Sequence, residues 1–211
     1  MGRDQRPPSG ASRVLPAATA VLRRGRPRSP KVHRAILDAA MQLLVEGGYA
    51  GLRLEHVAAR ARVGKTTIYR RWASKDELVL ELLLELASPH LAVTETGDTR
   101  GELLAVVNNA RRAITETPFG PVVRAVLSQI AINPALGDPF RKTVVQARRE
   151  EVGRVISRGV ARGDLRADAD VDVATEVLVG PVYFRLMFGG ELDDGFAERV
   201  VDAVLGGYAR R

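Results

Sequence analysis

The chain has no cysteine among its 211 residues, which excludes disulfides and thiolate metal sites. This composition is typical of a protein of the reducing cytosol. The three histidines, His33, His56 and His90, are scattered along the chain and do not have the spacing of a metal-ligand cluster. We therefore expect a cytoplasmic protein without a metal or other cofactor.

Long apolar runs are also missing. A membrane-spanning helix needs about 20 predominantly apolar residues, and no segment approaches that length. Residues 14–22 form the one apolar stretch near the N-terminus, but they include Pro16 and Thr19, and no clean cleavage site follows them. We therefore expect neither a membrane partner nor a secretion signal.

Two further absences concern fold and chemistry. No segment alternates apolar and polar residues as a half-buried strand does, and no internal repeat is present, so the sequence predicts an all-α fold. The chain also lacks a glycine-rich phosphate loop, metal-ligand spacing, and a nucleophile with a base nearby. An enzyme is therefore the rival interpretation, and we expect a protein that is not an enzyme.

Positive charge is present and is concentrated in two segments. Residues 1–34 carry nine Lys or Arg and one acidic residue, and residues 53–75 carry seven and one. The whole chain has a net charge of +7, so the remainder is acidic. A local basic patch on an acidic body is typical of a protein that binds a polyanion. A solvated charged surface is the alternative, above all for the first segment.

Residues 1–30 are rich in Pro, Gly, Ser and Arg and show no helical period, which predicts a disordered basic arm. Its last part contains Arg24, Arg26 and Arg28, and the neighbouring Gly and Pro favour an extended backbone. Such arms bind in the narrow minor groove of A·T-rich DNA. These three arginines are therefore candidate DNA contacts.

Residues 31–78 predict a small helical domain. A first helix should begin near Lys31 and end at the glycine pair 47–48, and a second should cover about 54–61. A break at 62–64 precedes a third helix, from Lys65 to Trp72. Ser74 and Glu77 then form a capping box that begins a fourth, longer helix.

Two short helices joined by a short turn are typical of a helix-turn-helix, and an ordinary small helical bundle is the alternative. The third helix favours the first interpretation, because polar residues lie at its N-terminal end, where a recognition helix enters the major groove. For Tyr69, packing beside Ile68 and Trp72 is the alternative to DNA contact. The polar residues are Lys65, Thr66, Thr67, Tyr69 and Arg70.

The chain after residue 78 predicts a larger helical domain, 79–211. We expect helices at about 102–117, 122–132, 138–162, 171–188 and 194–205. Asp138 and Pro139 should cap and begin the third of these, Gly163 should end it, and Gly180–Pro181 should kink or break the fourth. The apolar residues of the last two helices suit a dimer interface, and an ordinary core explains them nearly as well.

Polar or aromatic residues on these otherwise apolar helices are candidate contacts of a small-molecule ligand. Each has a surface or packing role as its alternative. The candidates are Asn108, Arg111, Phe119, Arg124, Gln129 and Tyr183.

A family resemblance rests on many residues of the first domain. They include Arg34, Ile36–Leu37, Ala39–Ala40, Leu44, Glu46, Gly48–Tyr49, Val57–Ala58, Ala61, Val63, the run 65–72 and Ser74–Lys75. Together they resemble the N-terminal domain of the tetracycline-repressor-like (TetR) family. Residues 164–205 resemble the C-terminal part of one branch of that family more loosely.

The resemblance implies an all-helical homodimer with two N-terminal reading heads and a C-terminal domain that binds a small-molecule effector and dimerises through its last two helices. It implies that the polar residues of the third helix face DNA, that Lys75 contacts phosphate, and that Tyr49 packs or bonds close to the backbone. The implied function is a repressor that a ligand releases from a near-palindromic double-stranded operator.

Two positions depart from the family pattern. Arg53 stands where a Ser or Thr usually caps the second helix. The arginine loses a cap worth ~1 kcal/mol, but it offers a phosphate contact. Arg62 stands where the turn usually has glycine. A non-glycine residue there costs roughly 1 kcal/mol if the backbone is left-handed. These departures keep open a helical ligand-binding or adaptor protein that does not bind DNA.

Overall fold

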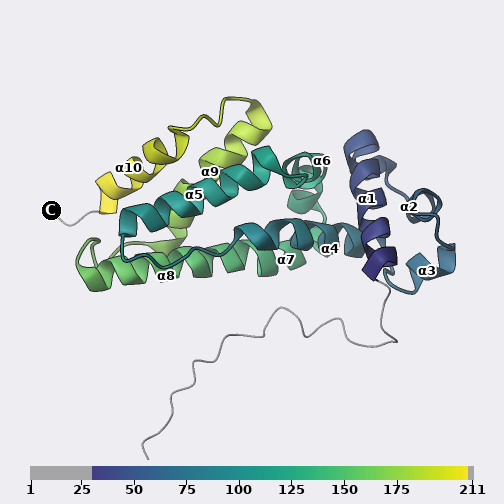
Figure 1. Ribbon diagram of the computed structural model, residues 1–211, viewed down its shortest axis with the longest axis horizontal. Helices are drawn as coiled ribbons and strands as arrows, with labels where there is room; N and C mark the ends of the chain where they lie inside the picture. Colours follow the sequence, from purple (N-terminus) through teal and green to yellow (C-terminus); the bar gives the residue numbers. More distant parts are fainter. Residues whose placement is uncertain (1–29, 209–211) are drawn as a thin grey trace, which may run out of the picture.

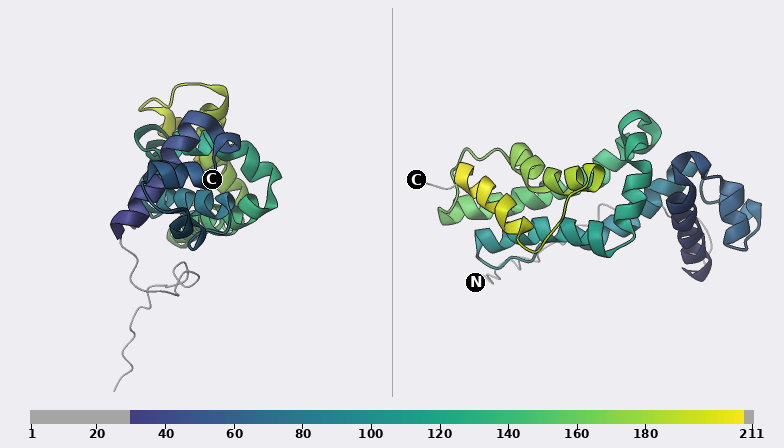
Figure 2. Two further views of the ribbon diagram at one scale, coloured as in Figure 1. Left: turned by 90° about the vertical axis from the view of Figure 1, so that its right-hand side faces the viewer. Right: turned by 90° about the horizontal axis from the view of Figure 1, so that it is seen from above.

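The computed structural model describes residues 30–208, and this part of the chain is entirely helical (Figure 1). It has an elongated shape, with α1 to α3 at one end and α10 near the other (Figures 1 and 2). The predicted basic arm, with Arg24, Arg26 and Arg28, lies outside the described residues except for Pro30, which begins α1. None of the described helices is both long and apolar enough to cross a bilayer.

Three helices form the head, which we define as residues 30–74. They are α1 (Pro30–Gly51), α2 (Leu54–Arg60) and α3 (Lys65–Tyr69). The expected end of the first helix is confirmed, because Gly48 leaves the helical region with φ 64° and only one further turn follows. The third helix is shorter than predicted, ending at Tyr69, although Ile68 and Trp72 both point into the core as expected.

Helix α4 (Lys75–Ala87) runs from the head into the rest of the molecule. Its capping box is present in modified form. The Ser74 hydroxyl accepts from the Glu77 amide at 3.2 Å, but the Glu77 carboxylate accepts from the Ala73 amide rather than from Ser74. Because α4 packs against α1 on one side and α6 and α7 on the other, it joins the two regions continuously across the predicted boundary at 78/79.

The body, residues 88–208, contains the remaining helices. After the 3₁₀ turn η1 (Ser88–His90) come α5 (Thr99–Glu116), α6 (Phe119–Ile132), α7 (Pro134–Phe140), the π-helical turn η2 (Arg141–Val145), α8 (Gln146–Arg162), α9 (Val171–Phe188) and α10 (Phe196–Tyr208). Helix α5 lies in the middle and packs against α6, α8, α9 and α10. Gly163 ends α8 with φ 84°, as predicted, because a left-handed residue there favours glycine.

The predicted start of a helix at Asp138 is wrong. Asn133 ends α6 and also caps α7, accepting from the Ala135 amide at 3.0 Å, and Pro134 occupies the first turn instead. Pro139 therefore lies inside a helix. It cannot donate a backbone hydrogen bond, and the chain widens into the π-helical turn directly after it. Pro181 is likewise inside a helix, and α9 continues through it without a break.

Candidate nucleic-acid interface and ligand cavity

The turn between α2 and α3 is held by backbone hydrogen bonds. The Val63 amide donates to the Ala58 carbonyl at 3.0 Å, and Arg62 between them adopts φ 53°, the left-handed conformation that the family pattern gives to glycine. Arg53 is the residue before α2 and makes no side-chain cap, so both departures noted in the sequence are real structural features. Neither prevents the helix-turn-helix from forming.

Two buried side chains fix the orientation of α3. Ile68 is fully buried and Trp72 is 2% exposed. The Trp72 indole donates to the Glu81 carboxylate of α4 at 2.6 Å and stacks on the His33 ring of α1. Trp72 is therefore a core residue. These two residues hold the inner face of the α3 segment against α1 and α4. Helix α3 lies at the end of the molecule (Figure 1).

The outward residues of α3 are accessible. Lys65, Thr66 and Arg70 are exposed and Thr67 is half-buried. Tyr69 is 48% exposed, so it is not a core residue, and its hydroxyl donates to Glu55 of α2 at 2.5 Å. This hydrogen bond lowers the pKa of Glu55 and raises the pKa of Tyr69. It links the two helices across the outer face. Sequence reasoning missed Glu55, because nothing in its spacing connects it to Tyr69.

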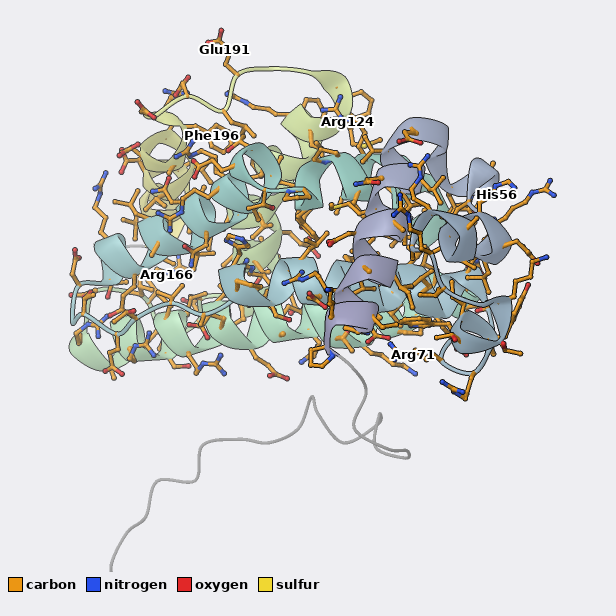
Figure 3. All side chains as sticks on the ribbon, turned by 45° about the vertical axis from the view of Figure 1, so that its right-hand side comes forward. His56, Arg71, Arg124, Arg166, Glu191 and Phe196 are labelled. Carbon is orange, nitrogen blue, oxygen red and sulfur yellow. The ribbon has the colours of Figure 1, made fainter. Side chains whose placement is uncertain are left out.

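Cations on this face lack the ion pairs that arginines form elsewhere. Among residues 30–208, Arg53, Lys65 and Arg70 form no ion pair. His56 of α2 also lies on the outer end of the head (Figure 3). In the body, by contrast, most arginines have a carboxylate partner, among them Arg100, Arg111, Arg141, Arg149, Arg154, Arg158, Arg162, Arg166 and Arg199. The outer face of the head therefore carries cations that form no ion pair with any described residue.

Lys75 lies differently from the other proposed DNA contacts. Its ammonium donates to the Tyr49 carbonyl at 3.0 Å and lies 4.0 Å from the centre of the Tyr49 ring. The Tyr49 hydroxyl in turn donates to Asp76, and the Asn133 amide of the body donates to both, at 3.3 and 3.2 Å. These four residues form an interdomain network that joins α1, α4 and the α6–α7 corner.

The body contains a mainly apolar cavity of about 270 Å³ where α4, α5, α6, α8 and α9 meet. Of the candidate ligand contacts, Phe119 and Tyr183 line it. Arg148 of α8, which the sequence did not single out, also lines it and is only 8% exposed. Arg148 belongs to the charged run 148–151, a pattern that is typical of a solvated surface. Other lining residues include Leu127, Phe140, Val144, Thr175, Glu176 and Val179.

The other candidates lie elsewhere. Arg124 lines a separate, more open hollow of about 620 Å³ between α1, α6 and the end of α9 (Figure 3). Asn108, Arg111 and Gln129 line neither space. Asn108 instead accepts a hydrogen bond from Arg111, which pairs with Glu116 at 3.7 Å.

One face of α9 is apolar and exposed. Phe184 is 63% exposed and Phe188 76% exposed, and the two rings lie 4.9 Å apart. Val177 and Met187 extend the same surface, which also borders a hollow against α10. Exposed apolar residues gathered in this way are typical of a protein–protein interface.

The helix-turn-helix with its unpaired cations, attached to a helical body with an internal cavity, defines the class of protein: a DNA-binding transcriptional regulator. Comparison with family models gives the particular family. Residues 36–82 match the model of bacterial regulatory proteins of the tetR family, and residues 93–204 match the tetracyclin repressor-like C-terminal domain. The chain belongs to the TetR family.

Relatives agree with this assignment. The chain is 31% identical to the HTH-type transcriptional regulator YdeS of Bacillus subtilis, with 85% of this chain and 90% of YdeS covered. It is 34% identical to the DNA-binding transcriptional repressor TetR of Mycobacteroides abscessus, with 88% and 95% covered. The crystal structure of the TetR family transcription regulator SCO0332 matches with a TM-score of 0.65 at 31% identity, covering 85% of this chain and all of that one.

Proposed function

We propose that the protein is a repressor that binds a near-palindromic operator as a homodimer and is released by a small molecule. Membership of a family of DNA-binding regulators supports this directly. Two heads related by a two-fold axis would contact half-sites ~34–36 Å apart. A regulator of this kind works where the chromosome is, so we place it in the cytoplasm, and we assign it no catalytic activity.

The observation that carries the proposal is the set of unpaired cations around α3. Lys65, Arg70 and Arg53 would bind phosphate, because none of them forms an ion pair among residues 30–208. Thr66, Thr67 and Tyr69 would contact base edges or thymine methyl groups. Lys75 would have to share its ammonium between phosphate and the Tyr49 carbonyl. We retain Arg24, Arg26 and Arg28 as minor-groove contacts on sequence grounds alone.

The dimer would form through α9 and α10. Phe184 and Phe188, with Val177 and Met187 on the same helix, are large apolar residues exposed at the surface of the body. A second copy of the same face would bury them in a two-fold interface. This arrangement leaves α2 and α3 free at the far end, where two heads could reach adjacent half-sites (Figure 2).

Helix α4 connects the cavity to the head. Ala87 at its end, and His90 and Leu91 just beyond, line the cavity, whereas Lys75 and Asp76 at its start belong to the interdomain network. A ligand that favours one position of α4 over another would change the placement of the head and so the affinity for operator. The region 79–211 would thus act as one ligand-binding and dimerisation domain.

The experiment is to select binding sites from random DNA with the purified protein and to footprint the selected sequence at physiological salt. We expect a protected near-palindrome. Tyr69→Ala should abolish protection at the protein concentration that protects with the wild type, whereas Tyr69→Phe, which removes only the hydroxyl bonded to Glu55, should weaken it less. Arg112→Ala removes an exposed cation of α5 in the body; it is the matched control and should bind normally. Protection that has no sequence preference would contradict the proposal.

A further inference from the structure

The internal cavity is mainly apolar, but Arg148, Thr175 and Tyr183 add polar groups to its lining. Phe119, Leu127, Phe140 and Val179 supply apolar surface from three different helices, α6, α7 and α9. Arg148 lines the same cavity, and its guanidinium donates to the carbonyls of His90 and Leu91, two further lining residues. A buried cation in an apolar cavity is costly unless something pairs with it, so its partners decide what the cavity can bind.

Arg148 is only partly satisfied by the protein. Its two terminal nitrogens donate to the carbonyls of His90 at 2.7 Å and Leu91 at 3.3 Å. A guanidinium has five N–H donors, and the others have no acceptor among residues 30–208. No carboxylate in this part of the chain forms an ion pair with Arg148.

The nearest acidic groups are engaged elsewhere. Glu151, one turn along α8, accepts from the Val93 amide at 2.7 Å and pairs with Arg154. Glu176 lies at the exposed edge of the cavity, where its side chain is 72% exposed and lies 3.8 Å from Arg149. Neither carboxylate forms an ion pair with Arg148, although Glu151 attracts its charge through space. Since a guanidinium keeps its proton at neutral pH, the cavity wall carries a positive charge that has no ion-pair partner among residues 30–208.

A second donor lies beside Arg148. The Tyr183 hydroxyl has no hydrogen bond to any residue from 30 to 208, and Tyr183 lines the cavity. Burial raises the pKa of Tyr183, although the nearby Arg148 charge acts in the opposite direction. The hydroxyl is therefore protonated at neutral pH and can donate to the same acceptor that Arg148 binds.

We propose that this cavity binds a compact monocarboxylate with an aromatic or alicyclic body, its carboxylate held by Arg148 and Tyr183 and its body packed against Phe119, Leu127 and Phe140. The inference deepens the proposed function, because it names the chemical class of the effector. A carboxylate matches the planar fork of a guanidinium and supplies the missing negative charge. A cationic ligand would be repelled by Arg148, and a neutral one would leave the charge unpaired.

Three probes of nearly equal size test the charge preference on the wild-type protein. They are 2-naphthoate, 2-naphthamide and 2-naphthylmethylammonium, each titrated calorimetrically into the full chain at neutral pH. We expect the carboxylate to bind at least about 10-fold more tightly than the amide, as hydrogen bonds to a charged group are the stronger kind. The ammonium should bind most weakly. An amide or ammonium that binds as tightly as the carboxylate, or no binding of the carboxylate at 1:1 stoichiometry, would overturn the proposal.

Variants locate the anion. Arg148→Met replaces the cation with an apolar side chain of similar length. It should weaken 2-naphthoate binding by about 10- to 100-fold and change 2-naphthamide binding less than about 3-fold. Tyr183→Phe should weaken the carboxylate by a smaller factor. Arg112→Met removes the same charge from the exposed side of α5 and should change neither ligand. Equal losses for carboxylate and amide in Arg148→Met would contradict the assignment, and the wild-type probe series stands independently if that variant does not fold.

Operator binding, measured in parallel on the selected DNA, separates the two proposals. Operator binding without any carboxylate preference would remove the effector class but leave the repressor. A carboxylate preference without operator binding would leave the ligand site but remove the repressor.

Discussion

The head and the body of this protein treat positive charge in opposite ways. On the outer face of the head, Arg53, Lys65 and Arg70 have no ion pair within the described chain. In the body, arginines such as Arg158 and Arg154 are matched to carboxylates that are themselves buried. The difference teaches how to recognise a surface with an external partner: charge that a fold satisfies internally stabilises it, whereas charge left unsatisfied together on one face is available to a polyanion.

Glu102 shows the internal use of charge most clearly. This carboxylate on α5 is fully buried, accepts from the Thr96 and Gly97 amides at 3.0 and 3.1 Å, and pairs with Arg158 at 2.6 Å. It thereby fastens the loop after η1 to α5 and α8. Burial alone would raise the pKa of Glu102, but these hydrogen bonds outweigh it and hold the pKa below its usual value.

We expect the largest change in stability when the hydrogen bonds and ion pair of Glu102 are removed. Glu102→Gln should lower the free energy of unfolding by about 3 kcal/mol at pH 7, because Arg158 loses its short ion pair with a buried carboxylate and keeps only the exposed Glu95 at 3.9 Å. Since the folded pKa is depressed, the stabilisation is fully present above the unfolded value of about 4.3 and is lost as the pH falls through the lower folded value. The free energies of unfolding of the wild type and the variant, measured with urea, should therefore become equal at acidic pH.

Its control is Glu116→Gln, which removes an exposed carboxylate paired with Arg111 at 3.7 Å. Exposed pairs contribute about 0–1 kcal/mol, so this variant should unfold almost as the wild type does. Similar losses for the two variants, or a Glu102 effect that does not change with pH, would show that burial does not make the Glu102 ion pair more stabilising than an exposed one.

A smaller effect is expected where the two regions meet. Asn133→Ser keeps a capping oxygen for α7 but removes the amide that donates to Tyr49 and Asp76. We expect stability to fall by about 1 kcal/mol. The decrease in operator affinity caused by 2-naphthoate should shrink, because the head is then less firmly joined to the body. Operator titrations with and without that compound measure this, with Asn108→Ser as the control. If 2-naphthoate lowered the operator affinity of the variant by the same factor as that of the wild type, the interdomain network would not transmit the effector signal.

The smallest effect concerns the strained turn of the head. Arg62→Gly should raise stability by up to about 1 kcal/mol, because glycine adopts φ 53° without the steric cost that arginine has there. Arg62→Ala removes the same charge but keeps the steric cost, so it should bring no such gain. Thermal unfolding compares them, and a gain in the alanine variant equal to that in the glycine variant would show that backbone strain is not the cause.

Sequence patterns predicted the head better than the body, for physical reasons. Ile68 and Trp72 are one helical turn apart, so their inward direction follows from spacing alone. The start of α7 did not follow, because Asn133–Pro134 and Asp138–Pro139 are equally good helix starts locally and only packing selects the first. Arg148 stands in a charged run, and its burial depends on α9 and η1, which are distant in sequence.

The salt dependence of operator binding tests the central claim most directly, since it reports how many phosphates the head neutralises. For wild type, Lys65→Ala/Arg70→Ala and the body control Arg112→Ala, the logarithm of the operator affinity would be measured against the logarithm of the salt concentration. The account predicts that the double variant binds more weakly and that its slope decreases by roughly one unit for each phosphate that it no longer neutralises, while the control keeps the wild-type slope. An unchanged slope in the double variant would contradict the assignment of these unpaired cations to DNA.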